Sequence, residues 1–460
     1  MSARVCFDVG KWERFQFTCI MMGMRSISLA LVILLAGCDD TTPPIPPRDS
    51  GPPADSGPGT TDAGVDAGPD FDAGPDFDGG GRDAGPPGDG GMPRCTINPD
   101  DRYKLTTDPG GGERIIGFAA NGDSFGVIWN ETRAGQPDIF ATRITSAGPG
   151  AEQRLTNQLS RENPPTLAAV GTQWIGSWVD NEGSVGFEVR SVLLNADLSL
   201  AGSVQAITST DMLVEDNPLL HNMSDGPFLL WAEDDMIAGT RVGRARTLNT
   251  DATPRGSIQS SSDASQRPGQ IALGELDSGP VALWAEGVGL SQDLIMQPLT
   301  REGAATGTPV TVSVEGNADG TVDAALFGSS GGAVVFGVLV AGVRSEVRFR
   351  ALNSTGDLLG SERSLLSPPA TGTDASIVPF AGGYAVAYRG DLSDGDGPRI
   401  LLMLVDGFGE VLDEMTVTDA AATGGRVTLR ATGDGQLGIA WANAVDTDTE
   451  ISFQLVRCGT

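Results

Sequence analysis

Few residues in this chain are suited to chemistry, and its carboxylates are the most regularly placed of them. Four segments carry an acid two positions after a tryptophan: Glu131, Asp180, Glu233 and Glu286. Carboxylates gathered on one face can bind a partner, and a suitably spaced pair can hydrolyse a glycosidic bond. Arginines recur nearby, for example Arg190, so the favoured interpretation is structural, with each acid fixing a turn. The functional alternative is an acidic binding face made by these four residues.

The chain has a single histidine, His221. A Ser–His–Asp hydrolase would need this residue, yet no nucleophile elbow accompanies it. A zinc site would need further ligands that the chain does not supply. We therefore expect His221 to be a hydrogen-bonded residue of a channel wall, and we expect no catalytic residue, no metal and no cofactor. No phosphate-binding or dinucleotide-binding fingerprint is present either.

The elements that position these groups follow a repeat. Core aromatic residues recur with steps of 49, 53, 53, 52, 52 and 53 residues along the chain. The seven positions are Trp129, Trp178, Trp231, Trp284, Phe336, Tyr388 and Trp441. A fixed period of this length is typical of a ring or stack of equivalent units.

Each unit reads as four short strands joined by turns. The second unit shows this most clearly, with apolar runs at 165–170, 173–179, 187–194 and 203–208 that are separated by Gly, Asn and Asp. Helical periodicity is nearly absent after residue 100, and a β-helix would have shorter rungs. The sequence therefore predicts an all-β, seven-bladed β-propeller over residues 95–460. In its inner strands Asp323 is the one acid.

The last unit lacks a fourth strand, and the segment before the first unit can supply it. Residues 102–107 match the fourth strand of unit one, so an N-terminal strand should complete the last blade and remove an open sheet edge. Alignment of the units places Cys95 and Cys458 at the same hairpin turn. We expect a disulfide between them, which stabilises the fold by roughly 4–5 kcal/mol on the chain-entropy model.

The N-terminal segment has the features of an export signal. Arg25 precedes the apolar run 27–35, which is too short to span a bilayer. The run ends in Leu35-Ala36-Gly37-Cys38, which resembles the bacterial lipobox. The resemblance implies that residues 1–37 are removed, with Cys6 and Cys19, and that Cys38 is acylated. Translation is expected to start within this segment, at Met21, Met22 or Met24.

Residues 38–94 are expected to form a disordered linker. They carry twelve aspartates against three arginines and almost no aliphatic bulk, so they cannot bury enough apolar surface to fold. The net charge of the whole chain is −30, and residues 95–460 contain one lysine, Lys104. Such an acidic surface repels phosphate backbones and argues against nucleic-acid binding.

The first unit resembles repeats in envelope lipoproteins of myxobacteria-like organisms. Those repeats have a Trp-x-Asp/Glu turn followed by Asp-Ile-x-x-x-Arg-Val/Ile, matched here by Trp129-Asn130-Glu131 and by residues 138–144. The match covers residues 100–460 and is sharp in units one and two. The resemblance implies a propeller and an envelope location, with no established activity.

Two functions remain open. In the favoured one, the protein is a non-enzymatic, monomeric lipoprotein that is held on the membrane by its acyl chains, at the periplasmic face or the cell surface. Its propeller would bind a protein or a glycan. In the alternative, it is a carbohydrate-active hydrolase that uses carboxylates on one propeller face. The mostly apolar inner strands favour the platform, and we expect no enzymatic activity.

Overall fold

The computed structural model describes residues 94–459, except for positions 107–115, 134, 158–160, 182–186, 210–212, 236, 264–265, 267, 289–290, 314–317, 341–343, 419–425 and 446–447. In this part the chain forms 29 strands and no helix, and so contains no helix able to cross a membrane. The strands belong to one compact unit, Asp83–Thr460. The predicted signal segment, Cys6, Cys19, Cys38 and most of the linker lie outside the described residues.

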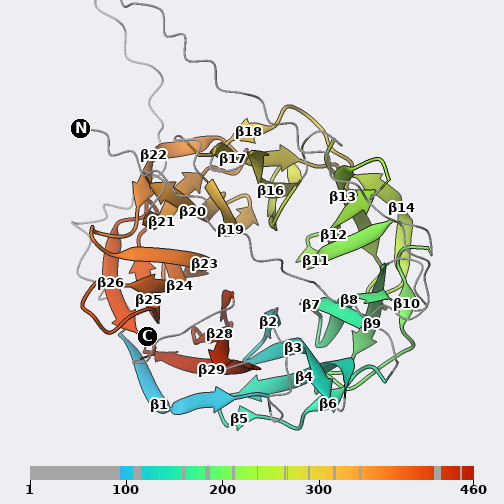
Figure 1. Ribbon diagram of the computed structural model, residues 1–460, viewed down its shortest axis with the longest axis horizontal. Helices are drawn as coiled ribbons and strands as arrows, with labels where there is room; N and C mark the ends of the chain where they lie inside the picture. Colours follow the sequence, from blue (N-terminus) through green and yellow to red (C-terminus); the bar gives the residue numbers. More distant parts are fainter. Residues whose placement is uncertain are drawn as a thin grey trace, which may run out of the picture. The chain divides into compact units, whose positions relative to one another are not determined.

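Seven small antiparallel sheets form the blades of a β-propeller, arranged in a ring (Figure 1). Within each blade the chain passes outward by hairpins from an innermost strand. The first three blades are β2 (Ile116–Asn121), β3 (Ser124–Arg133), β4 (Gln136–Thr145), β5 (Gly148–Pro149) and β6 (Gln153–Arg154); β7 (Arg161–Val170), β8 (Gln173–Asn181), β9 (Glu188–Leu194) and β10 (Gln205–Ala206); and β11 (Val214–Met223), β12 (Gly226–Asp235), β13 (Thr240–Leu248) and β14 (Pro254–Ser260).

The next three blades repeat this plan. They are β15 (Ile271–Leu276), β16 (Gly279–Val288), β17 (Ser291–Pro298) and β18 (Val310–Thr311); β19 (Ala318–Gly328), β20 (Gly332–Val340), β21 (Arg344–Leu352) and β22 (Leu358–Ser364); and β23 (Thr371–Phe380), β24 (Gly383–Asp391), β25 (Arg399–Val405) and β26 (Val411–Thr416). Blades 4 and 5 are joined by a short parallel pairing between β15 and β19. The predicted seven-bladed propeller is confirmed.

The seventh blade combines both ends of the domain. β27 (Val427–Ala431), β28 (Leu437–Val445) and β29 (Asp448–Cys458) are completed by β1 (Cys95–Lys104), which pairs antiparallel with β29. Cys95 lies opposite Cys458 in this register, and the two form a disulfide with their Cα atoms 3.9 Å apart. Both the donated strand and the disulfide were predicted from the sequence and are confirmed.

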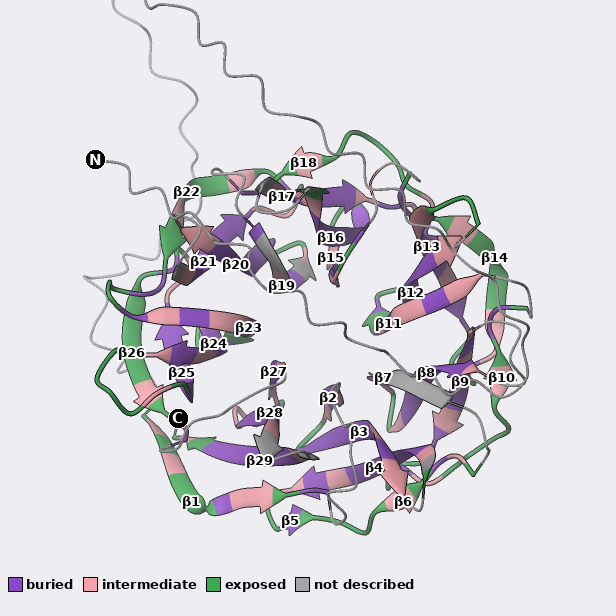
Figure 2. Cartoon of the chain, in the orientation of Figure 1, coloured by how far each residue is buried: buried purple, intermediate pink, exposed green. Residues whose placement is uncertain are grey.

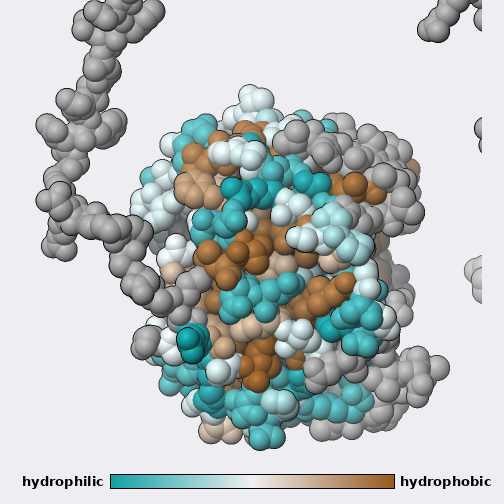
Figure 3. Space-filling model, turned by 90° about the vertical axis from the view of Figure 1, so that its left-hand side faces the viewer, coloured by the Kyte–Doolittle hydropathy of each residue, from teal (hydrophilic) through white to brown (hydrophobic). Residues whose placement is uncertain are grey.

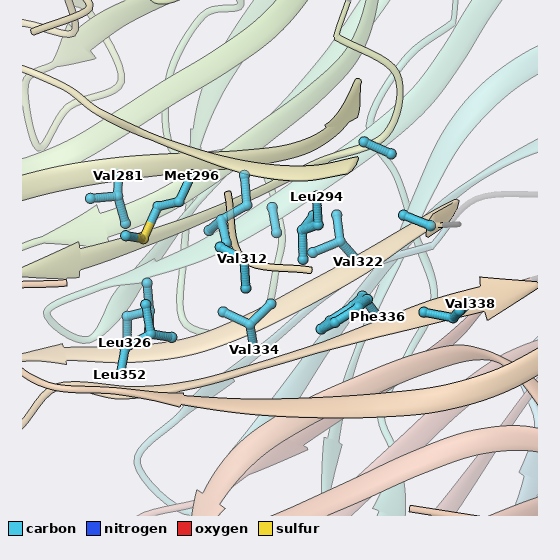
Figure 4. Close-up of a cluster of buried hydrophobic side chains, with 14 of the residues drawn as sticks. Val281, Leu294, Met296, Val312, Val322, Leu326, Val334, Phe336, Val338 and Leu352 are labelled. Atoms are coloured by element: carbon cyan, nitrogen blue, oxygen red, sulfur yellow. The ribbon is translucent and has the colours of Figure 1, made fainter. Parts of the chain in front are cut away.

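The core lies between neighbouring blades. All seven repeated aromatic residues are at most 1% exposed, because each packs between its own sheet and the next. Figure 4 shows one such layer between blades 4 and 5, a single cluster that includes Leu294 and Met296 of blade 4 and Val322 and Phe336 of blade 5. Close packing of buried side chains holds each blade against the next, which keeps the inner strands in place around the ring.

A hydroxyl after the fourth strand closes most blades. In six of them it accepts a hydrogen bond from a third-strand backbone N–H, at 2.7–3.2 Å; these residues are Thr106, Thr156, Thr208, Ser262, Ser313 and Thr418. Blade 5 is the exception. The Leu365 N–H donates to the backbone carbonyl of Val347 at 2.9 Å, and the next residue, Leu366, occupies the position of the hydroxyl residue. The repeated Ser or Thr is therefore a structural feature of the blade.

The rim of the ring is the exposed part of the blades. Figure 2 shows the outer strands β14, β22 and β26 mostly as exposed, while the strands inside them are buried. β22 and β26 lie on the side that faces the viewer in Figure 3, where hydrophobic patches alternate with hydrophilic ones. Leu359, Phe408 and Leu412 are among the exposed apolar residues of these two blades.

Candidate functional site

The inner strands of all seven blades line a central cavity of about 470 Å³. This volume lies within the range of small-molecule sites, which are mostly apolar with a few convergent polar groups. Most residues of the wall have apolar side chains, for example Phe118, Leu167 and Ile377. The polar side chains are Thr166, His221, Asn222, Asp323, Ser376, Arg426, Thr428 and Arg430. We call this cavity the central channel.

The repeat explains where these polar side chains lie. Asp323 and Ser376 pair across the hairpin with the residue just before the core aromatic of their blades, as do Thr166 and Thr428. His221 lies two residues beyond the equivalent position of blade 3. Because strand residues alternate between faces, two positions along a strand return a side chain to the same side. The blades therefore direct these groups to the channel.

Asp323 is the one carboxylate among the described residues of the channel wall, and it is held by donors from two blades. Its Oδ2 accepts hydrogen bonds from the Ser376 hydroxyl at 2.6 Å and from the Ile377 backbone N–H at 3.2 Å. Its Oδ1 accepts from the backbone N–H of Ala324 at 3.0 Å. These donors fix the position of the carboxylate at the channel wall.

Two arginines of blade 7 lie in the same wall. The Nε and Nη1 atoms of Arg430 donate to the backbone carbonyls of Phe118, at 3.0 Å, and Leu429, at 2.7 Å. The Nη2 atom of Arg426 donates a longer bond of 3.4 Å to the carbonyl of Val322. Arg430 thereby joins the last blade to the first, and its side chain is only partly exposed. Burial lowers the pKa of Arg430, and the charge of Asp323 opposes that shift.

His221 lies in the channel wall, as the sequence predicts, but the described contacts include no hydrogen bond of its side chain, so the predicted hydrogen-bonded state is not found. The side chain is exposed to the channel, although protein encloses the channel on its sides. Desolvation is the main cause that lowers the pKa of His221, and the positive charge of Arg430 lowers it further. The charges of Glu275 and Asp323 act in the opposite direction. His221 is therefore neutral at pH 7, a state in which it can accept a proton.

The predicted acidic face has a different arrangement from the one expected of a binding surface. Glu131 is 1% exposed, and its Oε2 accepts from the Trp129 indole N–H at 3.0 Å and from Arg133 at 2.6 Å. Asp180 is 5% exposed and lies 3.5 Å from Arg190. Both carboxylates are thus inside their blades, where they fix the end of the second strand.

The same position is structural in the other blades. Glu233 is 8% exposed and is 2.7 Å from Arg244 of the third strand. In blade 7 the amide of Asn443 replaces the acid and accepts from the Trp441 indole N–H at 2.8 Å. Glu286 is partly exposed, and burial raises its pKa. Glu131, Asp180 and Glu233 are therefore each paired within their own blade, and the described residues hold no cluster of His, Cys, Asp or Glu suited to a metal ion.

The sequence alone missed the arginines of the channel. Arg426 and Arg430 lie at the start and near the end of the predicted inner strand of the last unit. They are charged, whereas the other predicted inner strands are mostly apolar. Only the closed ring places them near Asp323, because blade 7 and blade 5 are separated by more than 100 residues in the chain. The available signal was the position of Arg430, which is equivalent to that of His221.

Comparisons with known proteins identify no family for this chain. The chain matches no protein-family profile and no curated protein sequence. Similar solved structures include a Trypanosoma rangeli sialidase in complex with 2,3-difluorosialic acid (10% identity, 79% of this chain and 59% of that chain, TM-score 0.44). Another is a subtype N10 neuraminidase-like protein of a little yellow-shouldered bat isolate (9% identity, 80% of this chain and 99% of that chain, TM-score 0.42). A third is an endo-arabinase from Bacteroides thetaiotaomicron (10% identity, 76% of this chain and 96% of that chain, TM-score 0.33). The chain thus spans 59% of the length of the trypanosomal sialidase.

These comparisons correct the expectation that the protein is not an enzyme, because the similar propellers include a sialidase and an endo-arabinase. That expectation rested on the scarcity of acid–base groups along the chain. In the folded ring, two of those few groups, Asp323 and His221, share one channel. These matches have identities of 9–10% and TM-scores of at most 0.44, so the reaction must be argued from the residues of the channel.

Proposed function

We propose that the protein is carbohydrate-active and hydrolyses a glycosidic bond in its central channel. The observation that carries the proposal is the meeting of Asp323 and His221, from blades 5 and 3, in one cavity of about 470 Å³. Their side chains interact electrostatically, since the charge of Asp323 raises the pKa of His221 against the effect of burial. A concave site with few convergent polar groups and a perturbed titratable residue is typical of an active site.

The chemistry of the two groups fits this reaction. Glycoside hydrolysis passes through a transition state in which positive charge develops on the sugar ring. The Asp323 carboxylate, fixed by Ser376 and two backbone N–H groups, is suited to stabilise that charge. A water oxygen bonds the anomeric carbon as the glycosidic C–O bond breaks; neutral His221 is suited to accept the proton of that water, and the leaving oxygen takes a proton from solvent in the channel. The apolar parts of the wall, such as Phe118 and Leu167, give a sugar ring a surface to pack against.

The proposed location follows from the N-terminal segment, which lies outside the described residues. In this proposal acylated Cys38 holds the protein on the extracytoplasmic side of a membrane, and the acidic linker carries the propeller away from it. Each buried methylene of an acyl chain contributes about 0.8 kcal/mol to membrane binding. The Cys38→Ser variant should therefore leave the membrane fraction in a detergent-partition assay, and its retention there would contradict the anchor.

The test of the activity is a turnover screen with the purified full-length chain. Polymeric and oligomeric glycans of neutral and acidic type are incubated with the protein, and the release of new reducing ends is measured. We expect release from at least one class of glycan, and we expect the Asp323→Asn variant to abolish it. A screen in which no glycan is cleaved would contradict the proposal.

A further inference from the structure

The channel differs in charge from the rest of the molecule. The chain carries 60 acidic against 30 basic residues, which makes its surface strongly negative. The described wall of the channel has two arginines, Arg426 and Arg430, against one carboxylate, Asp323. Since the pKa of His221 is lowered, this residue adds no positive charge at pH 7. An acidic propeller thus encloses a locally basic channel.

The donors of these arginines are only partly used. A guanidinium has five N–H groups. Among the described contacts, Arg430 donates to two backbone carbonyls and Arg426 to one, and neither forms an ion pair with a carboxylate. A carbonyl satisfies an N–H group but leaves the positive charge uncompensated. Arg430 is also partly buried, so its charge is screened less than that of a surface arginine.

Asp323 does not remove this positive charge by direct pairing. Its two oxygens accept from Ser376 and from the backbone N–H groups of Ile377 and Ala324. The carboxylate is therefore stabilised within blades 5 and 6, while the guanidinium groups belong to blade 7. The arginines lie near Asp323, since Arg426 donates to the Val322 carbonyl beside it and the charge of Asp323 acts on Arg430. No described contact pairs either guanidinium directly with this carboxylate, so their remaining N–H groups can still bind an anion.

We propose that the channel binds a carboxylate-bearing glycan, with Arg430 and Arg426 as the residues that recognise the carboxylate. This inference rests on the proposed function and names its substrate class. The planar fork of a guanidinium matches a carboxylate and bonds it through two parallel N–H groups. A sugar acid held by its carboxylate on blade 7 would place its ring across the channel, toward Asp323 and His221. The low-dielectric wall strengthens this attraction relative to water.

The test measures binding on an array of uronic-acid and ulosonic-acid oligosaccharides, each beside its carboxyl-reduced counterpart. Tricarballylate serves as a carboxylate without a sugar. We expect the full-length protein to bind an acidic glycan at least ~10-fold more tightly than its reduced form, because hydrogen bonds to charged groups contribute most. The preference should decrease as salt increases, because added ions screen the attraction.

The variants are Arg430→Gln and Arg426→Gln, with Arg246→Gln as the matched control. Arg246, on β13, also donates to two backbone carbonyls, those of Gly256 and Ile207, and burial also lowers its pKa, but it lies away from the channel wall. We expect the acid preference to fall at least ~10-fold in Arg430→Gln and to be unchanged in the control. Arg426→Gln removes one weaker backbone bond, so it reports on binding even where Arg430→Gln lowers stability.

The outcomes separate this inference from the proposed function. Equal binding of acidic and reduced glycans, or a preference that survives both channel variants, overturns the carboxylate site and leaves the glycan function standing. Tricarballylate bound as tightly as the best acidic glycan supports the anion site and contradicts the glycan function. No binding to any glycan or to tricarballylate overturns both.

Discussion

The Ser376 hydroxyl donates to Asp323 Oδ2 at 2.6 Å and accepts from the Leu429 backbone N–H at 3.0 Å. One serine therefore links the inner strands of blades 5, 6 and 7 through side-chain hydrogen bonds. In blade 2, Thr166 occupies the equivalent position and accepts from the Leu220 backbone N–H of blade 3 at 3.1 Å. The channel wall is thus stabilised by the same polar groups that give it chemical character.

The first prediction concerns this link. Ser376→Ala should lower the free energy of unfolding by about 1–3 kcal/mol, because it leaves a buried N–H of Leu429 without its acceptor. Ser257→Ala, in the exposed strand β14, should change it by less than ~0.5 kcal/mol. Denaturant titration compares the two. Equal midpoints for both variants would show that the link contributes nothing.

The second prediction concerns closure of the ring. The double variant Cys95→Ser, Cys458→Ser should lose roughly 4–5 kcal/mol on the chain-entropy model, because the unfolded chain regains the freedom of its long loop. Wild-type protein treated with reductant should show the same decrease in its denaturant midpoint. If neither treatment moves the midpoint, β1 holds blade 7 closed without the disulfide.

The third prediction concerns pH. Burial lowers the pKa of His221 in the folded state below its usual value of about 6.5, whereas Arg430 adds to that shift and Glu275 and Asp323 oppose it. As the pH falls below about 6.5, the unfolded chain therefore binds a proton that the folded chain does not, and stability decreases. His221→Gln should be free of this decrease. Melting temperatures of the two proteins between pH 7 and pH 5 should converge or cross, and parallel curves would contradict the shift.

The fourth prediction separates the two interpretations of the repeated acids. Glu131→Gln should lower stability by about 1–3 kcal/mol, since the buried carboxylate bonds both Trp129 and Arg133. Glu286→Gln should leave stability unchanged or slightly increased, because burial and Asp293 raise the pKa of Glu286 and so disfavour its charge. Calorimetry measures both. A Glu131→Gln variant of wild-type stability that loses ligand binding would restore the binding-face hypothesis.

The fold could be predicted from the sequence because each blade repeats the same burial requirement. Trp129 and its six equivalents must pack between sheets, so their spacing gives the number of blades. Cys95 and Cys458 could be paired because alignment of the units places both at one turn. These features depend on short-range patterns repeated along the chain, which a single sequence displays directly.

The site could be predicted only in part. His221 was placed in the channel wall, and the favoured structural role of Glu131 and Asp180 agrees with their contacts, because the indole N–H and the arginines that they meet are neighbours within one blade. The grouping of Asp323, His221 and Arg430 depends on the closed ring, which brings blades 3, 5 and 7 around one cavity. No local pattern in the sequence encodes that proximity.

Asp323 gives the most direct test of the account. The amide oxygen of Asn at this position can still accept from Ser376 and Ile377, and only the bond from the Ala324 N–H is lost, so the wall should remain folded while the negative charge is removed. Asp234→Asn is the control, because it removes a carboxylate paired with Arg241 away from the channel. The kcat for glycan cleavage by the full-length protein should fall by at least ~100-fold in Asp323→Asn, with an unchanged melting temperature, and stay near wild type in Asp234→Asn. Cleavage that persists undiminished in Asp323→Asn would contradict the assignment of the active site to the central channel.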